Sequence, residues 1–379
     1  MTVAKRTRVA IEVGILGATG MVGQQFVALL GNHPWFRVTW LGASERSAGR
    51  RYGELPWRLP APLADGIGSL PVETPAPGRG PRLVFSALDA SVAGEAEAAF
   101  AAAGHVVVSN ARNHRMDPLV PLLVPEINPE HLALIPQQRR QRGWSGAIVT
   151  NPNCSTVFLA LALAALRDLE PERVLVTTMQ ALSGAGYPGV ASLDALGNVI
   201  PYIAGEEEKI ETETQKILGR LAASSAGACP ERSPRLSPAS AAAELQPSAG
   251  IRPHPVRISA QANRVPVANG HTEAVSIEFR EPRSREEILA AVRVFAGKPQ
   301  SLDLPSAPAQ PLVYLDGADR PQPRLDVERL GGMAVCAGRL RPCPVLGWKF
   351  VLLGHNTIRG AAGAAILNAE LMAAEGWLD

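Results

Sequence analysis

The sequence predicts an α/β protein in which a doubly wound parallel sheet is followed by an α+β domain with an open mixed sheet. The chain of 379 residues is long enough for two hydrophobic cores. In its first part, short apolar runs rich in β-branched residues alternate with segments of helical spacing, as in a parallel sheet. In its later part, strand-like runs follow one another without a helix between each pair. These three observations predict two domains of different architecture.

The first domain is expected to begin with a strand at residues 8–16, an apolar run that ends in glycines. Residues 21–30 have the apolar spacing of an amphipathic helix. The stretch 46–81 is dense in proline and glycine, which predicts loops and short edge structure. The other expected elements are strands at 37–41, 82–86 and 105–109 and an alanine-rich helix at 92–103.

The second domain is expected to open with a buried helix, because residues 157–166 are uniformly apolar. Residues 222–250 are rich in alanine, serine and proline and lack periodicity, which predicts a mobile surface insertion. Strands are expected at 173–180, 257–259 and 274–279.

The final segment, 359–377, is alanine-rich with helical spacing and is expected to pack back on the first domain. The expected boundaries are therefore 1–153 for the first domain, completed by 356–379, and 154–355 for the second.

Composition excludes several classes of function. A formal net charge of +2 gives no electrostatic reason to expect nucleic acid or a membrane as a partner. The longest apolar run is far shorter than a membrane span, and no signal-peptide core follows the basic N-terminus. The four cysteines are widely separated and form no CxxC pair, so neither a metal site nor a disulfide framework is expected. The expected location is a reducing cytoplasm.

Cys154 is the strongest candidate for a catalytic group. It directly precedes the apolar helix, and Ser155 or Thr156 is expected to cap the first turn of that helix. A cysteine at a helix N-terminus experiences the positive end of the helix dipole, which favours the nucleophilic thiolate. The alternative is a small buried cysteine that packs as an apolar group.

A dinucleotide site is predicted where the first strand meets the first helix. Gly14, Gly17, Gly20 and Gly23 stand three residues apart there. Glycines permit a tight turn and close backbone approach, while the N–H groups of the helix receive a pyrophosphate, as in Rossmann-like domains. A glycine turn with a purely structural role is the alternative.

The end of the second strand favours NADP over NAD. An NAD site usually carries an acid at this point to hold the ribose 2′-hydroxyl. Here the strand is followed by Ser44, Glu45, Arg46 and Ser47, and two hydroxyls with a guanidinium suit a 2′-phosphate. Glu45 is expected to point to solvent.

Six motifs, in order along nearly the whole chain, resemble the aspartate-β-semialdehyde dehydrogenase family, especially its archaeal and fungal branch. They are GATGMVG (17–23), NPNCST (151–156), SGAGYPG (183–189), GEEEK (205–209), NGHTE (269–273) and HNTIRGAAG (355–363). The resemblance implies a Rossmann-like domain, a catalytic and dimerisation domain, and a homodimer or homotetramer. It also implies NADPH-dependent reductive dephosphorylation of L-4-aspartyl phosphate to L-aspartate 4-semialdehyde, a step that feeds lysine, threonine, methionine and diaminopimelate synthesis.

The chemistry of the residues agrees with that implication. The Cys154 thiolate would attack the acyl phosphate, and hydride would reduce the resulting thioester to the aldehyde. His271, expected on the loop before residues 274–279, would exchange protons with the thiol and the thiohemiacetal oxygen, because imidazole titrates near neutral pH. Gln180 resembles a family glutamine that orients substrate beside the thiol.

The resemblance also assigns substrate contacts. It implies that Arg264 clamps the α-carboxylate and that Glu206 receives the α-ammonium. Lys209 and Arg115 would take the phosphate, with Asn110 nearby. The other acids of the segment 206–213 are expected to form a charged helix face with i,i+4 pairs.

Cofactor contacts are expected from residues in five parts of the chain. These residues are Gly17, Thr19, Gly20, Met21, Val22, Ser44, Arg46, Ser47, Ser86, Ser183, Gly184, Asn356 and Thr357.

Other functions fit the motifs less well. Malonyl-CoA reductase resembles the same branch and uses the same thioester chemistry, and it remains the main alternative. Its substrate, malonyl-CoA, has no α-ammonium for Glu206 to bind. N-acetyl-glutamyl-phosphate reductase carries Tyr-Pro-Thr after its cysteine, whereas Ser155 and Thr156 stand here. Glyceraldehyde phosphate dehydrogenase has a different cysteine context and usually takes NAD. A sensor that only binds NADP would need no nucleophile.

Overall fold

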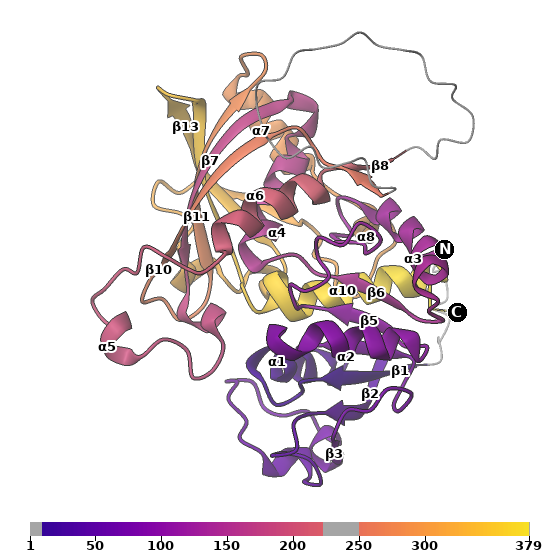
Figure 1. Ribbon diagram of the computed structural model, residues 1–379. Coiled ribbons are helices and arrows are strands. Elements are labelled where there is room, and N and C mark those ends of the chain that lie inside the picture. The colour runs from indigo at the N-terminus through magenta and orange to yellow at the C-terminus, as the bar shows by residue number, and fades with distance from the viewer. Residues whose placement is uncertain (1–9, 223–249, 379) are drawn as a thin grey trace, which may run out of the picture.

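The computed structural model describes residues 10–222 and 250–378, and in this part of the chain two six-stranded sheets form the body of the molecule (Figure 1). Most of the predicted insertion at 222–250 lies outside the described residues. Among the described residues, no helix is long and apolar enough to cross a lipid bilayer.

The first sheet is entirely parallel, with strand order β3-β2-β1-β4-β5-β6. This order places the sheet's switch point between β1 and β4, where doubly wound domains bind dinucleotides. The prediction of a Rossmann-like sheet is confirmed. β3 is a two-residue edge strand within 46–81, where short edge structure was expected, whereas β6 was not predicted. The strands are β1 (Ile11–Leu16), β2 (Phe36–Gly42), β3 (Val72–Glu73), β4 (Leu83–Ser86), β5 (Val106–Ser109) and β6 (Ala147–Thr150). The helices of this part are α1 (Met21–Leu30), α2 (Ala90–Ala102) and α3 (Ile135–Arg142).

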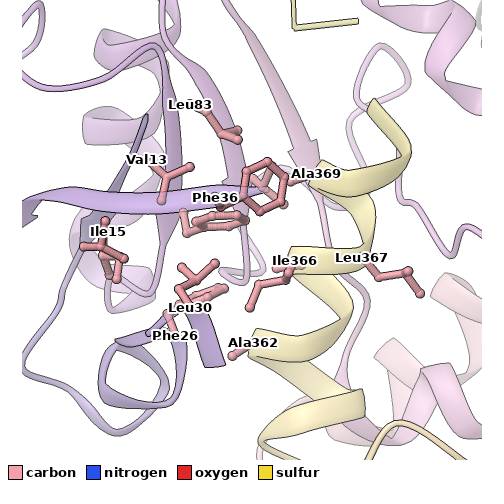
Figure 2. Close-up of a cluster of buried hydrophobic side chains, with 14 of the residues drawn as sticks. Val13, Ile15, Phe26, Leu30, Phe36, Leu83, Ala362, Ile366, Leu367 and Ala369 are labelled. Atoms are coloured by element: carbon pink, nitrogen blue, oxygen red, sulfur yellow. The ribbon is translucent and has the colours of Figure 1, made fainter. Parts of the chain in front are cut away.

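The last helix, α10 (Gly363–Ala374), completes the core of this sheet (Figure 2). Ile366 and Ala369 point toward Phe36 and the first strand, and all three are at most 2% exposed. Burying a large aliphatic side chain such as Ile366 stabilises the fold by roughly 1.5–3 kcal/mol. Segments that are more than 300 residues apart in sequence therefore share one hydrophobic core.

The second sheet is mixed, with strand order β10-β7-β11-β14-β13-β12. β7 lies parallel to β10 and antiparallel to β11. The strands are β7 (Pro171–Gln180), β10 (Arg257–Arg264), β11 (His271–Phe279), β12 (Leu312–Leu315), β13 (Val335–Cys343) and β14 (Gly347–Gly354). A small separate pair, β8 (Arg220–Leu221) and β9 (Ile251–Arg252), flanks the undescribed segment.

One face of this sheet packs against helices, and the other is open (Figure 1). Its core is shared with α4 (Cys154–Ala165), α6 (Glu206–Ile217) and α7 (Arg285–Val294). On the opposite face, Leu175 of β7 is 48% exposed. The predicted open mixed sheet is confirmed. The last three strands were not predicted. β12 is a run of only four residues, a lysine and flanking glycines shorten the apolar run of β14, and glycine, arginine and proline interrupt the apolar pattern of β13.

The acids of α6 do not form the predicted solvated face of i,i+4 pairs. Glu207 accepts a hydrogen bond from the backbone N–H of Ala262, and Glu211 accepts one from Ala260. Both partners lie on β10, the edge strand of the second sheet. The carboxylates therefore satisfy N–H groups that an unprotected sheet edge would leave free.

Candidate active site

The nucleophile candidate lies at the junction of the two sheets. β6 ends at Thr150, and Cys154 is the first residue of α4. The cap of this helix is Asn153 rather than Ser155 or Thr156, since its side-chain oxygen accepts hydrogen bonds from the backbone N–H groups of those two residues.

A turn of π-helix, η7 (Ile358–Ala362), packs against the cysteine. A methyl group added at Gly360 would lie 2.6 Å from the Cβ of Cys154, so only glycine allows this approach. The turn is anchored by Arg359, which is fully buried and forms two hydrogen bonds of 2.8 Å with the Glu126 carboxylate. π-Turns inside helices occur frequently at functional sites.

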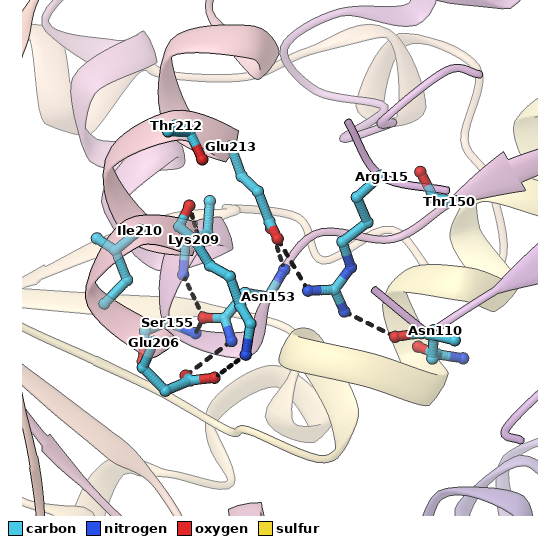
Figure 3. Close-up of polar contacts among 12 residues, drawn as sticks. Asn110, Arg115, Thr150, Asn153, Ser155, Glu206, Lys209, Ile210, Thr212 and Glu213 are labelled. Atoms are coloured by element: carbon cyan, nitrogen blue, oxygen red, sulfur yellow. Dashed lines mark hydrogen bonds and ion pairs between the residues drawn. The ribbon is translucent and has the colours of Figure 1, made fainter. Parts of the chain in front are cut away.

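A polar network joins the start of α4 to α6 (Figure 3). The Glu206 carboxylate accepts hydrogen bonds from Lys209 at 2.6 Å, Asn153 at 2.8 Å and Gln180 at 3.2 Å. Burial raises the pKa of Glu206, but the Lys209 cation and these hydrogen bonds outweigh burial and leave the pKa below its ordinary value. A carboxylate has about four acceptor positions, so one remains for a further donor.

Glu213 is a site residue that the sequence interpretation missed. It accepts hydrogen bonds from the Arg115 guanidinium at 3.0 Å and from the backbone N–H of Asn153 at 2.6 Å. Figure 3 shows Glu213 and Glu206 on the same helix, with Asn153 between their carboxylates. The spacing of seven residues between Glu206 and Glu213 would have placed both acids on one helix face.

Arg115 and Asn110 are in contact. The second amino group of Arg115 donates to the Asn110 backbone oxygen at 2.7 Å. The side chain of Asn110 is held by Asn151 at 2.9 Å and by the backbone oxygen of Ser86 at 3.1 Å. Asn110 thus supports Arg115 through its backbone.

His271 and Arg264 converge on one backbone segment after β7. His271 is the first residue of β11, so the prediction of a preceding loop was wrong. Its Nδ1 accepts a hydrogen bond of 3.0 Å from the Ala181 N–H, and Arg264 donates to the Ala181 carbonyl at 2.7 Å. Gly184 packs against both side chains.

Cys154 is not the thiolate that was expected from its position at a helix N-terminus. Burial, and to a smaller extent the negative charge of Glu206, raise the pKa of the Cys154 thiol to about 12. The cations of Arg115, Arg264 and Lys209 lower it, but less strongly. Burial and the neighbouring Arg264 lower the pKa of His271 to about 3, with smaller opposing effects. The ligand-free pair is therefore a thiol and a neutral imidazole.

A large cleft of about 1140 Å³ lies at the switch point of the first sheet. The residues predicted for the cofactor that line it are Gly17, Thr19, Gly20, Met21, Val22, Ser44, Arg46 and Ser47. Glu45 is exposed, as expected, yet also lines the cleft. Gly17 has φ +74° and could not carry a methyl group, which would lie 2.6 Å from the backbone oxygen of Ala87. The turn therefore has the close backbone geometry that a pyrophosphate requires.

Both parts of the chain contribute to this cleft. The guanidinium of Arg58 lies 4.0 Å above the ring of Tyr187, and both residues line the cleft. Arg58 follows β2, while Tyr187 follows β7, and no pattern in the sequence indicates that these residues meet.

The remaining predicted cofactor residues, Ser86, Ser183, Gly184, Asn356 and Thr357, do not line the cleft. Asn356 accepts a hydrogen bond from the Gly270 N–H at 2.9 Å and donates to Ser183 at 2.8 Å. It therefore ties the residue before His271 to the loop after β7.

The fold and site define a nicotinamide-dependent dehydrogenase that carries a thiol at a helix start. Two family models match the chain: the NAD-binding domain of semialdehyde dehydrogenase over residues 12–135, and its dimerisation domain over 163–229 and 240–359.

Curated relatives place the chain more narrowly. It is 47% identical to aspartate-semialdehyde dehydrogenase of Archaeoglobus fulgidus, over 96% of this chain and 98% of the relative. It is 48% identical to that of Cryptococcus neoformans, over 98% and 99% of the two chains. The chain belongs to the aspartate-semialdehyde dehydrogenase family.

Solved structures agree with this assignment. The Candida albicans enzyme with NADP has a TM-score of 0.84 and 39% identity, over 97% of this chain and 100% of that chain. Aspartate semialdehyde dehydrogenase II of Vibrio cholerae, complexed with ASA, has a TM-score of 0.72 and 26% identity, over 97% and 99% of the two chains.

The high pKa of Cys154 predicts how it reacts in the absence of substrate. With a pKa of about 12, its thiolate fraction rises about tenfold for each pH unit between 7 and 9. Iodoacetamide labelling of the Cys154 peptide, followed by mass spectrometry, should accelerate by that factor without a plateau. A plateau below pH 8 would show that the helix dipole outweighs burial.

The position of Arg46 in the cleft leads to a prediction about the preference for NADPH over NADH. Removing a guanidinium that pairs with a 2′-phosphate typically costs about 10- to 100-fold in affinity. Arg46→Ala should therefore weaken NADPH by that factor and NADH by less than about threefold, measured by fluorescence titration. Arg50→Ala, a neighbouring arginine outside the cleft lining, is the control. Equal losses for both cofactors would mean that the phosphate binds elsewhere.

Proposed function

We propose that this protein catalyses the NADPH-dependent reductive dephosphorylation of L-4-aspartyl phosphate to L-aspartate 4-semialdehyde. The observation that carries the proposal is the set of charges around one thiol. One anion, Glu206, and three cations, Arg115, Arg264 and Lys209, act on the Cys154 sulfur. The substrate has the complementary set, with one ammonium, one carboxylate and one phosphate.

In this reaction the Cys154 sulfur forms a bond to the acyl carbon, and the carbon–oxygen bond to phosphate breaks. NADPH, when bound, supplies hydride to the carbon of the resulting thioester. The aldehyde then leaves as the carbon–sulfur bond breaks, and the sulfur takes up a proton. The sum is acyl phosphate, NADPH and one proton giving aldehyde, phosphate and NADP.

Each charged residue has a role in this proposal. Arg264 clamps the α-carboxylate: its Nη1 donates to the backbone oxygen of Ala181, and a guanidinium has five N–H donors, so further donors are available. Glu206 uses its remaining acceptor position for the α-ammonium. Arg115 and Lys209 bind the phosphate, and Gln180, which contacts Glu206, helps to orient the substrate.

The proposed cofactor residues fall into two groups, those that line the cleft and those that do not. Those that line the cleft hold the pyrophosphate, the ribose and the 2′-phosphate. Ser86, Ser183, Gly184, Asn356 and Thr357 belong to the nicotinamide end, nearer to His271, in this proposal. Asn356 contributes there by holding Gly270 and Ser183 in place.

The proposal extends to the oligomeric state of the protein and to its cellular location. We propose a homodimer or homotetramer, supported by the match to a dimerisation domain and by the open face of the second sheet. A cytoplasmic location is supported by the need for a reduced nucleophile and by the three described cysteines, which are all free.

The direct test is the reverse reaction. The wild-type protein should reduce NADP in the presence of L-aspartate 4-semialdehyde and inorganic phosphate, followed at 340 nm, and should require both. Cys154→Ser should lose nearly all turnover and still bind NADP, because a serine hydroxyl is a poor nucleophile without a strong base.

Two results would contradict the proposal. Near-normal turnover of Cys154→Ser would exclude the covalent mechanism. Reduction of malonyl-CoA by the wild-type protein, without activity on the semialdehyde, would replace the substrate.

A further inference from the structure

The segment that carries Arg115 is held in place by a buried lysine of α6, Lys216. Arg115 lies in residues 110–121, a described segment that follows β5 and is neither helix nor strand. The buried backbone groups of such a segment need hydrogen-bond partners from elsewhere in the chain. The position of this segment matters in the proposed function, on which the following steps rest, because Arg115 binds the phosphate there.

The ammonium of Lys216 is surrounded by carbonyl oxygens of this segment. Its Nζ donates to the backbone oxygens of Arg115 at 2.6 Å, Asp117 at 2.8 Å and Val120 at 3.0 Å. An ammonium has three N–H donors, so these three bonds use all of them. Lys216 is only 5% exposed, and lysine is almost never buried to this extent unless it is paired.

Lys216 is charged at neutral pH. Burial lowers its pKa to about 8, and the carboxylates of Asp117 and Glu213 oppose this shift. The side chain is therefore mainly an ammonium at pH 7. A neutral amine would supply only two donors for the three carbonyl oxygens.

Arg115 is thus tied to α6 at two points. Its Nη1 donates to Glu213 at 3.0 Å, and its own carbonyl accepts from Lys216. Glu213 and Lys216 are three residues apart, so both lie on one face of the helix. Figure 3 shows the guanidinium between Glu213 and the backbone oxygen of Asn110. One helix therefore fixes both the side chain and the backbone of this arginine.

The same helix is attached to the nucleophile and carries the second proposed phosphate cation. Glu213 accepts a hydrogen bond from the backbone N–H of Asn153, which precedes Cys154. Lys209 lies one turn before Glu213 on α6. Because Arg115 is tied to this helix, the two cations keep a fixed position relative to each other and to the start of α4.

We propose that Lys216 is a positioning residue for phosphate binding and that it acts through Arg115. Its ammonium holds the backbone of residues 110–121, and this keeps the Arg115 guanidinium in place. Lys216 does not itself bind the phosphate, since its three donors are already used. Neither residue lines the cofactor cleft, so the binding of NADP does not depend on this contact.

The test is the KM for inorganic phosphate in the reverse reaction of the full-length protein, with aspartate semialdehyde and NADP saturating. Lys216→Met has a similar length and removes all three donors. It should lower kcat/KM for phosphate by about 10- to 100-fold, mainly through KM, as is usual when a hydrogen bond of a charged group is lost. The affinity for NADP should stay within about threefold.

A double-mutant cycle shows whether Lys216 acts through Arg115. Arg115→Met alone should raise the KM for phosphate by more than Lys216→Met does. In the Arg115→Met background, Lys216→Met should change this KM by less than about twofold, because the group that it positions is gone. Two effects that multiply would overturn the inference, and so would an unchanged KM in Lys216→Met.

Gln215→Met is the matched control on the same turn of α6. Its Nε2 donates to the backbone oxygen of Val256, which is outside the Arg115 segment. This variant should keep the KM for phosphate within about twofold of the wild-type value. An increase equal to that of Lys216→Met would mean that any loosening of α6 has the same effect, and it would overturn the inference.

A second variant decides the question if Lys216→Met does not fold. Lys216→Gln keeps two N–H donors for the carbonyl oxygens, and it should raise the KM for phosphate by at least about threefold. This increase should disappear in the Arg115→Met background, and an unchanged KM or a multiplying effect would again overturn the inference. Absence of phosphate-dependent turnover in the wild-type protein would count against the proposed function instead.

Discussion

The structure of the site depends on Asn153, which makes three different contacts at the start of α4. Its side-chain oxygen caps the helix, its side-chain nitrogen donates to Glu206, and its backbone N–H donates to Glu213. The residue next to the nucleophile is therefore attached to both acids of α6. Each acid is in turn paired with a cation, Lys209 or Arg115. Because these contacts are buried, the loss of one partner would leave an unpaired charge, which is costly.

The charges and the burial around Cys154 also explain why its side chain is a protonated, weakly nucleophilic thiol before substrate binds. The helix dipole and three cations favour a thiolate, whereas burial and Glu206 favour the thiol, and the latter effects dominate for Cys154. In the proposed function, the substrate ammonium would neutralise Glu206. That would remove one of the effects that raise the thiol pKa at the moment when the acyl phosphate is bound.

Much of the fold could be predicted because its signals are local. The glycines between β1 and α1, and the apolar run of α4, each specify an element within one segment of sequence. The start of α4 was misplaced by a few residues, since several residues near Cys154 could cap a helix. The strands β12 to β14 were missed because β12 and β14 offer only short apolar runs and polar residues interrupt β13. Part of their pairing also depends on contacts distant in sequence, such as that of β14 with β11.

The parts of the site that could not be predicted involve the backbone or contacts between distant segments. Ala181 contacts His271 and Arg264 through its peptide groups, which no side-chain motif can indicate. The contact between Arg58 and Tyr187 joins two loops that are 129 positions apart in sequence. Glu213 could have been found from helical spacing, but its partner Arg115 lies almost a hundred residues earlier.

The central claim is that the acyl group is carried by the sulfur of Cys154. The most direct measurement is mass spectrometry of the protein after incubation with L-aspartate 4-semialdehyde and NADP in phosphate-free buffer. Without phosphate the thioester cannot be released as acyl phosphate, so the Cys154 peptide should gain the mass of an aspartyl group, and addition of phosphate should remove it. An aspartyl adduct on another residue, or none while NADP is reduced, would contradict the account.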